Sequence, residues 1–276
     1  MKNTLILFFA LFLSVGLSAQ DFPQPSPKAS VSQVVGVTNI TVDYSSPGVK
    51  GRRLFGELIP YGQVWRTGAN KATAITFDSA VEVGGTAVRP GSYSVFTIPY
   101  EDGRMALILN SDTELYGTRN RDNSKDVASV ELKHTRAKES VERMMFSFYN
   151  TSDSGTELHF AWGVHRFMVP INVATSKIVE ATVNERLDEF GQQYEFYADA
   201  ASYYFGQGNY EVAKKYGEIS VEMSSKFWNT HTLAKIYKEL GETEKATKMA
   251  ERSLELSKKA EYQPYIDRNK KLLEEL

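Results

Sequence analysis

The feature that most constrains this chain is a change in hydrophobic periodicity near residue 174. Before this point, short segments rich in β-branched and aromatic residues alternate apolar with polar positions, which is typical of strands with one solvent-facing side. After it, glycine and proline become rare, and apolar residues recur at helical spacing. The sequence therefore predicts two domains, a strand domain at residues 20–174 and a helical domain at residues 175–276.

Turn-forming pairs such as Gly84-Gly85, Pro90-Gly91 and Asp102-Gly103 punctuate the first half. No helical pattern separates its strands, so we expect antiparallel pairing and a β-sandwich. The predicted strands are 40–45, 73–79, 92–99, 105–110, 127–133, 143–150, 157–163 and 166–173.

The second half repeats itself at an offset of about 33 residues, as in other helical repeats. The stretch ASYYFGQGNYEVAKKY (201–216) aligns with AKIYKELGETEKATKM (234–249). The matched positions are two alanines, a tyrosine and a glycine. This pattern resembles the tetratricopeptide repeat, in which small residues let paired helices pack closely. The whole chain is therefore expected to be α+β and multidomain, with tetratricopeptide-like helical hairpins at its C-terminus.

The first residues, MKNTLILFFALFLSVGLSAQ, match a secretory signal peptide. One lysine precedes an apolar run at residues 5–13, and small residues Ser18 and Ala19 follow. The run is too short for a membrane span of about 20 apolar residues. We expect residues 1–19 to be removed and the mature chain to be exported to the periplasm with no transmembrane segment.

The amino-acid composition limits the kinds of binding and catalytic site that the chain can form. The chain has no cysteine, which excludes disulfides, thiolate metal sites and cysteine nucleophiles. Its formal net charge of -2 gives no general attraction to nucleic acid. Motifs of nucleophile elbows, phosphate-binding glycine loops and helical metalloproteases are lacking. We expect no cofactor and no metal, but catalytic groups distant in sequence leave no local motif, so enzymatic activity stays open.

Two other groups of polar residues have competing interpretations. His159 and His165 have no carboxylate-rich ligand spacing, so partly exposed strand histidines are favoured over a metal site. A glycine-flanked basic cluster is either a solvated, salt-bridged loop or an anion site. The histidines are His134, His159, His165 and His231, and the basic cluster is Lys50, Arg52 and Arg53.

The stretch PYGQVWRTGANKAT (60–73) is the densest in unusual residues. Pro60 fixes φ and Gly62 permits a tight turn, so Tyr61 is expected at a corner. Trp65 supplies a large apolar anchor with one hydrogen-bond donor. Arg66 offers a planar fork suited to a carboxylate, a phosphate or a pair of sugar hydroxyls.

This loop has two interpretations. In the structural one, Trp65 lies in the core, Arg66 pairs with a carboxylate such as Asp43 or Glu57, and Asn70 locks the turn. In the binding one, the loop presents Arg66 and Asn70 to a ligand, because functional groups gather on loops held by a rigid sheet.

Residues 45–77, with 85–99, 107–110 and 160–171, closely resemble a family of exported bacterial proteins known as domain of unknown function DUF2911. The resemblance spans roughly residues 30–173. It supports the fold and the loop motif and implies no established activity. The most specific part is the order of Arg53, Phe55, Gly56, Pro60, Tyr61, Gly62, Trp65, Arg66, Gly68, Ala69 and Asn70.

We therefore expect an exported binding or scaffold protein of the cell envelope, with a ligand site on the strand domain and a helical domain that docks a partner. An envelope protein, peptide or glycan is the expected ligand. The alternative is a hydrolase of an envelope glycan or peptide, in which Arg66 and Asn70 orient the substrate. In a third interpretation the loop is purely structural and function resides in the helices. The candidate ligand-binding residues are Arg53, Tyr61, Trp65, Arg66 and Asn70.

Overall fold

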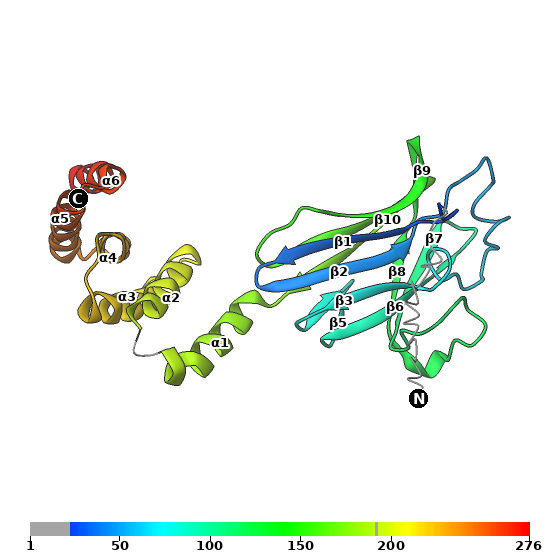
Figure 1. The fold of residues 1–276 in the computed structure, drawn as a ribbon, viewed down its shortest axis with the longest axis horizontal. Coiled ribbons are helices and arrows are strands. Elements are labelled where there is room, and N and C mark those ends of the chain that lie inside the picture. Colours follow the sequence, from blue (N-terminus) through cyan, green and yellow to red (C-terminus); the bar gives the residue numbers. More distant parts are fainter. Residues whose placement is uncertain (1–22, 191–192) are drawn as a thin grey trace, which may run out of the picture. The chain divides into compact units, whose positions relative to one another are not determined.

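The computed structural model describes residues 23–190 and 193–276, so the expected signal peptide lies outside the described residues. The chain divides into two compact units, one ending at Thr175 and one beginning at Ser176. Strands build the first unit and helices the second, which makes the chain α+β (Figure 1). Among the described helices, none combines the length and apolarity that crossing a membrane requires.

The larger sheet has six strands in the order β1-β2-β3-β6-β7-β8, and every neighbouring pair is antiparallel. Two of its hairpins turn at positive-φ glycines, Gly36 between β1 and β2 and Gly103 between β6 and β7. Glycine adopts this left-handed backbone without steric cost. The strands are β1 (Lys28–Val35), β2 (Thr38–Ser45), β3 (Thr73–Phe77), β6 (Gly91–Pro99), β7 (Arg104–Asn110) and β8 (Asp126–Lys133).

The smaller sheet has four strands in the order β5-β4-β10-β9. They are β4 (Val81–Val83), β5 (Thr86–Val88), β9 (Thr135–Tyr149) and β10 (Gly155–Val173). The prediction of two separate strands at 157–163 and 166–173 is wrong, because β10 runs through both. Its pairing with β9 shifts register on both sides of Gly163, which has a φ of 56°. A β-bulge thus replaces the expected turn.

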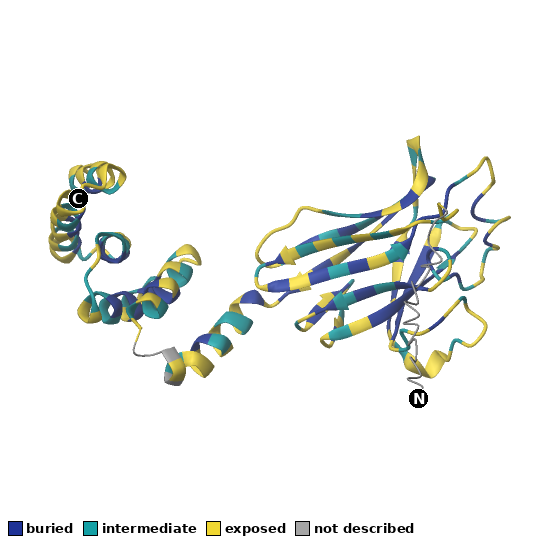
Figure 2. Cartoon of the chain, viewed as in Figure 1, coloured by how far each residue is buried: buried dark blue, intermediate teal, exposed yellow. Residues whose placement is uncertain are grey.

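Aromatic side chains from both sheets meet in a shared core. The Trp65 ring stacks on Trp162 of β10 at a centroid distance of 5.3 Å. Tyr44 of β2 meets Phe146 of β9 edge to face at 5.1 Å. Buried and exposed positions alternate along the strands around this core (Figure 2). The period-2 pattern in the sequence therefore reflects one face packed inward and one face exposed.

The helical unit consists of α1 (Thr175–Phe190), α2 (Tyr194–Gly206), α3 (Tyr210–Met223), α4 (Phe227–Glu239), α5 (Thr243–Lys259) and α6 (Gln263–Glu274). The two aligned repeats correspond to the pairs α2–α3 and α4–α5. Gly208 and Gly241 occupy equivalent turns with φ of 73° and 74°. Ala213 and Ala246 are fully buried, so the second helix of each pair approaches the first closely.

Candidate functional site: an arginine cleft beside a histidine pair

Trp65 is a core residue that anchors the loop. Its side chain is 7% exposed, and its Nε1 donates a hydrogen bond to the Gly68 carbonyl at 3.1 Å. Its backbone pairs with Thr97 of β6 through two hydrogen bonds of 2.8 Å. The indole therefore fixes the loop against both sheets and is not available to a ligand.

Arg66 lies beside this anchor, and no charged partner for it is found among the described residues. It makes no ion pair with Asp43 or Glu57 within the described chain. Glu57 lies instead 3.5 Å from Arg53. The Nε atom of Arg66 is buried and has no hydrogen-bond acceptor among the described residues. The carboxylate pairing expected in the structural interpretation is therefore not what holds this arginine.

Asn70 serves the turn. It adopts a φ of 59°, and its Nδ2 donates to Ser45 Oγ at 3.3 Å and to the Ser26 carbonyl at 3.5 Å. Thr67 also has a positive φ, of 52°, and its carbonyl accepts a 2.6 Å hydrogen bond from Thr73 Oγ1. A β-branched residue rarely adopts this backbone. These hydrogen bonds, of which the one to the Thr67 carbonyl is buried, hold the loop.

Arg53 and Tyr61 lie at a site separate from Trp65, Arg66 and Asn70. They line a cleft of about 300 Å³, here called the arginine cleft. Trp65, Arg66 and Asn70 do not line it. None of the described residues that line the cleft is Asp or Glu. Its polar lining residues are Arg52, Arg53, Tyr61, Arg136, Ser140 and His165.

Close packing of residues 49–55 against the bulge in β10 forms the wall of the cleft. A Cβ added to Gly163 would lie 3.1 Å from Leu54 and 3.6 Å from Val49, so glycine lets this loop approach the strand. The backbone N–H of Val49 donates to the Glu142 carbonyl of β9 at 2.8 Å. The loop that carries Arg52 and Arg53 is therefore fastened to the smaller sheet.

The three arginines are held to different degrees. Arg52 is fixed, because its Nε donates to the Val49 carbonyl at 3.0 Å and its Nη2 to the Gly48 carbonyl at 2.7 Å. Arg53 has only the exposed pair with Glu57, and such pairs contribute little. Arg136 is exposed and forms no ion pair in the part of the chain that is described. Two guanidinium groups are thus available to an anion.

His165 lines the cleft and forms a pair with His134. His134 Nε2 and His165 Nδ1 lie 2.8 Å apart, and the two rings stack at 4.9 Å. Phe55 packs edge-on against both rings. Burial lowers the pKa of His165 to about 4, helped by His134, Arg136 and Arg166. Burial and Arg136 also lower the pKa of His134. Both rings are therefore neutral at pH 7, and one donates to the other.

Register explains why sequence analysis missed this pair. Thr135 pairs with Arg166 and Arg136 pairs with His165 only because β9 gains extra residues along the bulge. No local spacing signals that arrangement, although Gly163 close to His165 was a hint of irregular backbone. His165 is buried, contrary to the expected partly exposed strand histidine.

The neutral His165 predicts a pH dependence of stability. Its pKa is about 4 in the folded chain and near 6.5 in a model peptide, so below pH 6.5 the unfolded chain binds a proton that the folded chain rejects. The free energy of unfolding should therefore fall as the pH drops from 6.5 toward 4. Urea unfolding across this range should show His165→Gln to be less pH-dependent, by up to about 1.4 kcal/mol per pH unit. Equal slopes would contradict the assignment.

Fold and site together define an α+β protein whose antiparallel sheets carry a basic cleft with no carboxylate among its described lining residues. A family model described as "Protein of unknown function (DUF2911)" matches residues 26–171, more than half of the chain. The chain therefore belongs to the DUF2911 family, which confirms the resemblance. The match includes every residue of the arginine cleft, whereas the helical unit lies outside it. No curated protein matches the sequence. In residues 23–190 and 193–276, no three His, Cys, Asp or Glu side chains are grouped to hold a metal ion.

Proposed function

We propose that this chain is an exported binding or scaffold protein of the cell envelope, and that the arginine cleft holds an anionic group of an envelope protein, peptide or glycan. The observation that carries the proposal is a cleft with three arginines and no carboxylate among its described lining residues. A cluster of arginines of this kind attracts anions, and guanidinium forks bind carboxylates and phosphates through paired hydrogen bonds.

The remaining lining groups fit the same chemistry. Tyr61 and Ser140 add hydroxyls. Neutral His165 adds an imidazole that can form a hydrogen bond but carries no charge. The volume of about 300 Å³ is at the lower end for ligand sites. It suits one sugar or one amino-acid residue, so the cleft would hold the charged end of a larger ligand.

We also propose that the strand unit is a β-sandwich, that the helices form tetratricopeptide-like hairpins, and that the chain is exported. The aromatic core shared by the two sheets supports a β-sandwich. Equivalent turn glycines and buried alanines in α2–α3 and α4–α5 support tetratricopeptide-like hairpins that dock a partner. Export to the periplasm is supported by the signal-like residues 1–19, and cell fractionation tests it.

Removing the two available guanidinium groups should strongly weaken anion binding. For an Arg53→Ala/Arg136→Ala variant, we expect the affinity for inorganic phosphate or glucuronate to fall at least tenfold, since a hydrogen bond to a charged group contributes about 1.5–3 kcal/mol. Isothermal titration at low salt measures this. Arg89→Ala is the control, because Arg89 is exposed and lies outside the cleft. Equal affinity of the double variant and the wild type would refute the anion site.

A hydrolase is the second candidate, and the neutral His165 in contact with His134 favours it, because a neutral imidazole can accept a proton. Arg66 and Asn70 do not line the cleft, so orienting the substrate would fall to Arg53 and Arg136. Release of soluble fragments from purified envelope glycan by the wild type, lost in His165→Gln, would establish this candidate. Binding without release would favour the first.

A further inference from the structure

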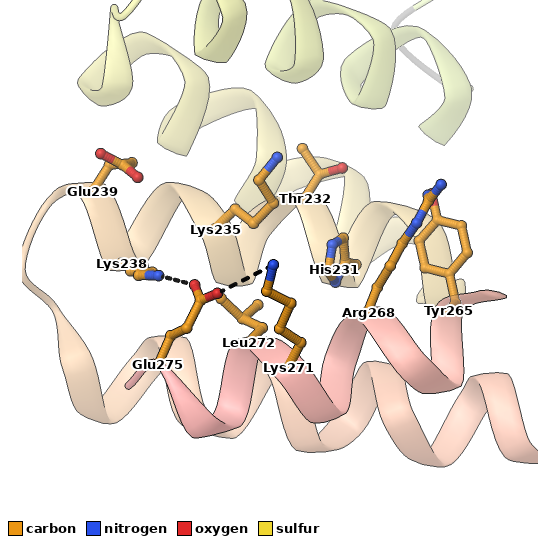
Figure 3. A pocket seen from close by; sticks show the side chains of 10 residues that line it. All are labelled: His231, Thr232, Lys235, Lys238, Glu239, Tyr265, Arg268, Lys271, Leu272 and Glu275. Atoms are coloured by element: carbon orange, nitrogen blue, oxygen red, sulfur yellow. Dashed lines mark hydrogen bonds and ion pairs between the residues drawn. The ribbon is translucent and has the colours of Figure 1, made fainter. Parts of the chain in front are cut away.

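Two recesses of the helical unit, each of about 510 Å³, differ in how their polar groups are engaged. In the recess between α4 and α6, Lys238 forms an ion pair with Glu275, and Lys271 lies 3.9 Å from the same carboxylate (Figure 3). The other recess lies between α1 and the α2–α3 pair and is here called the α1 recess. Its volume is within the range of small-ligand sites.

Helix α1 lies outside the two repeats and supplies one wall of the α1 recess. Val179 and Val183, one helical turn apart, pack into the core cluster of α2 and α3. Glu180 and Asn184 follow them directly in sequence, so they lie about 100° further round the helix. Both line the recess. Burial of the apolar stripe therefore fixes a polar stripe of α1 beside the α2–α3 pair.

Tyrosine rings form part of the opposite wall. The Tyr204 ring of α2 stacks on Tyr216 of α3 at a centroid distance of 5.8 Å, and Tyr203 meets Tyr204 edge to face at 5.3 Å. Contacts between the rings hold this aromatic surface in place. The wall consists of Tyr203, Tyr204, Gln207, Asn209, Val212, Lys215 and Tyr216.

Several polar side chains around the α1 recess are free to bind a ligand. Within the described chain, the side chains of Glu180, Asn184 and Gln207 make no hydrogen bond or ion pair. Lys215 has no carboxylate partner there, and its Nζ lies 5.4 Å from the centroid of the Tyr216 ring. The described lining residues thus carry one negative and one positive charge. Charge therefore selects for neither an anion nor a cation.

Tyr203 carries a hydroxyl that the fold does not satisfy. Its Oη is buried and has no hydrogen-bond partner among the described residues. A buried hydroxyl without a partner costs stability, and native proteins contain few such groups. A ligand that places a hydrogen-bonding group beside this Oη would supply the partner.

We propose that the α1 recess binds a neutral saccharide, whose hydroxyls are held by the carboxamides of Asn184 and Gln207 and by Tyr203 Oη. A sugar hydroxyl both donates and accepts hydrogen bonds, as carboxamides and tyrosine hydroxyls do. The tyrosine rings offer apolar surface to the C–H groups of the sugar. Glu180 would repel an anion, and an apolar ligand would leave the polar groups unpaired. This site goes beyond the proposed function and is independent of the arginine cleft.

Titration of the full chain with uncharged disaccharides tests the proposal. The probes are cellobiose, maltose and N,N′-diacetylchitobiose, and ligand-observed NMR should show millimolar or tighter binding of at least one. Asn184→Ala/Gln207→Ala should weaken that binding about tenfold, because two neutral hydrogen bonds are lost. Both side chains are exposed, so the variant should fold like the wild type. Gln63→Ala/Asn120→Ala removes the same groups from exposed positions outside the recess and should leave binding unchanged.

Tyr203→Phe separates binding from folding. It should weaken disaccharide binding by about three- to tenfold, the effect of one neutral hydrogen bond. Its melting temperature should stay the same or rise, because the removed hydroxyl has no partner among the described residues. Tyr265→Phe removes a hydroxyl from the recess between α4 and α6 and should bind like the wild type (Figure 3). A lower melting temperature of Tyr203→Phe with unchanged binding would show a structural hydroxyl and contradict its assignment to the ligand.

Other outcomes would overturn the site as a whole. They are the absence of binding of all three disaccharides by the wild type, and unchanged binding by Asn184→Ala/Gln207→Ala. Tighter binding of an unstructured twelve-residue peptide, lost in the same variant, would assign the recess to a peptide and would also overturn it. The Arg53→Ala/Arg136→Ala variant should bind the disaccharide normally, because those arginines line a cleft of the strand unit.

Discussion

Trp65→Ala is expected to lower the free energy of unfolding of the strand unit by about 3–5 kcal/mol. Removal of the indole leaves a cavity between the sheets, where it stacks on Trp162 and meets Phe55 and Phe160 edge-on. The hydrogen bond to the Gly68 carbonyl is lost as well. Chemical denaturation gives the free energy, and the melting temperature of the unit should fall by roughly 10 °C.

The adjacent residue supplies the matched control. Arg66→Ala should change the free energy of unfolding by less than about 1 kcal/mol, because the side chain is only partly buried and has no ion pair among the described residues. The two variants differ by one position in the same loop, so a general weakness of the loop cannot explain a difference between them. If Arg66→Ala were as unstable as Trp65→Ala, the assignment of Trp65 as the anchor would fail.

Gly36→Ala is expected to have the second large effect, a loss of about 2–5 kcal/mol from a strained turn combined with overpacking. Gly36 has a φ of 58°, and a Cβ there would lie 2.1 Å from Thr175 Oγ1 and 2.4 Å from the Asp153 carbonyl. The second neighbour is backbone, so the β1–β2 turn or the segment at Asp153 must move. The Thr175 hydroxyl donates to the same Asp153 carbonyl, which limits that movement.

Gly103→Ala isolates the backbone contribution. Gly103 also lies in a hairpin turn with a positive φ, of 83°, but a Cβ there would meet no atom within 4 Å. Its substitution should cost about 1–2 kcal/mol from the left-handed conformation alone. Thermal unfolding of both variants measures the difference. Equal losses would show that crowding at Gly36 contributes nothing and that the turn relaxes freely.

The sequence indicated the arginine cleft only in part. Lys50, Arg52 and Arg53 were recognised as a basic cluster with an anion-binding alternative, and two of them line the arginine cleft. Arg136 gave no such signal, because only the register of β9 on β10 places it opposite His165.

Local patterns in the sequence determined the class of the fold. Alternating apolar positions and turn glycines specify strands and hairpins through nearest neighbours, and helical spacing with Gly208 and Gly241 specifies the paired helices. The strands give way to α1 at Thr175, where the periodicity changes. The local patterns did not indicate β1, β4 or β5, and they divided β10 at its bulge.

The sequence by itself thus determined the α+β class, the DUF2911 motif and the basic character of residues 50–53. Only the tertiary structure decided what each candidate residue does. Backbone pairing with Thr97 places Trp65 in the core. The register of β9 on β10 places Arg136 opposite His165, and His134 contacts His165. These contacts join residues more than 25 positions apart. Long-range register is set by the packing of whole sheets, so no local pattern encodes it.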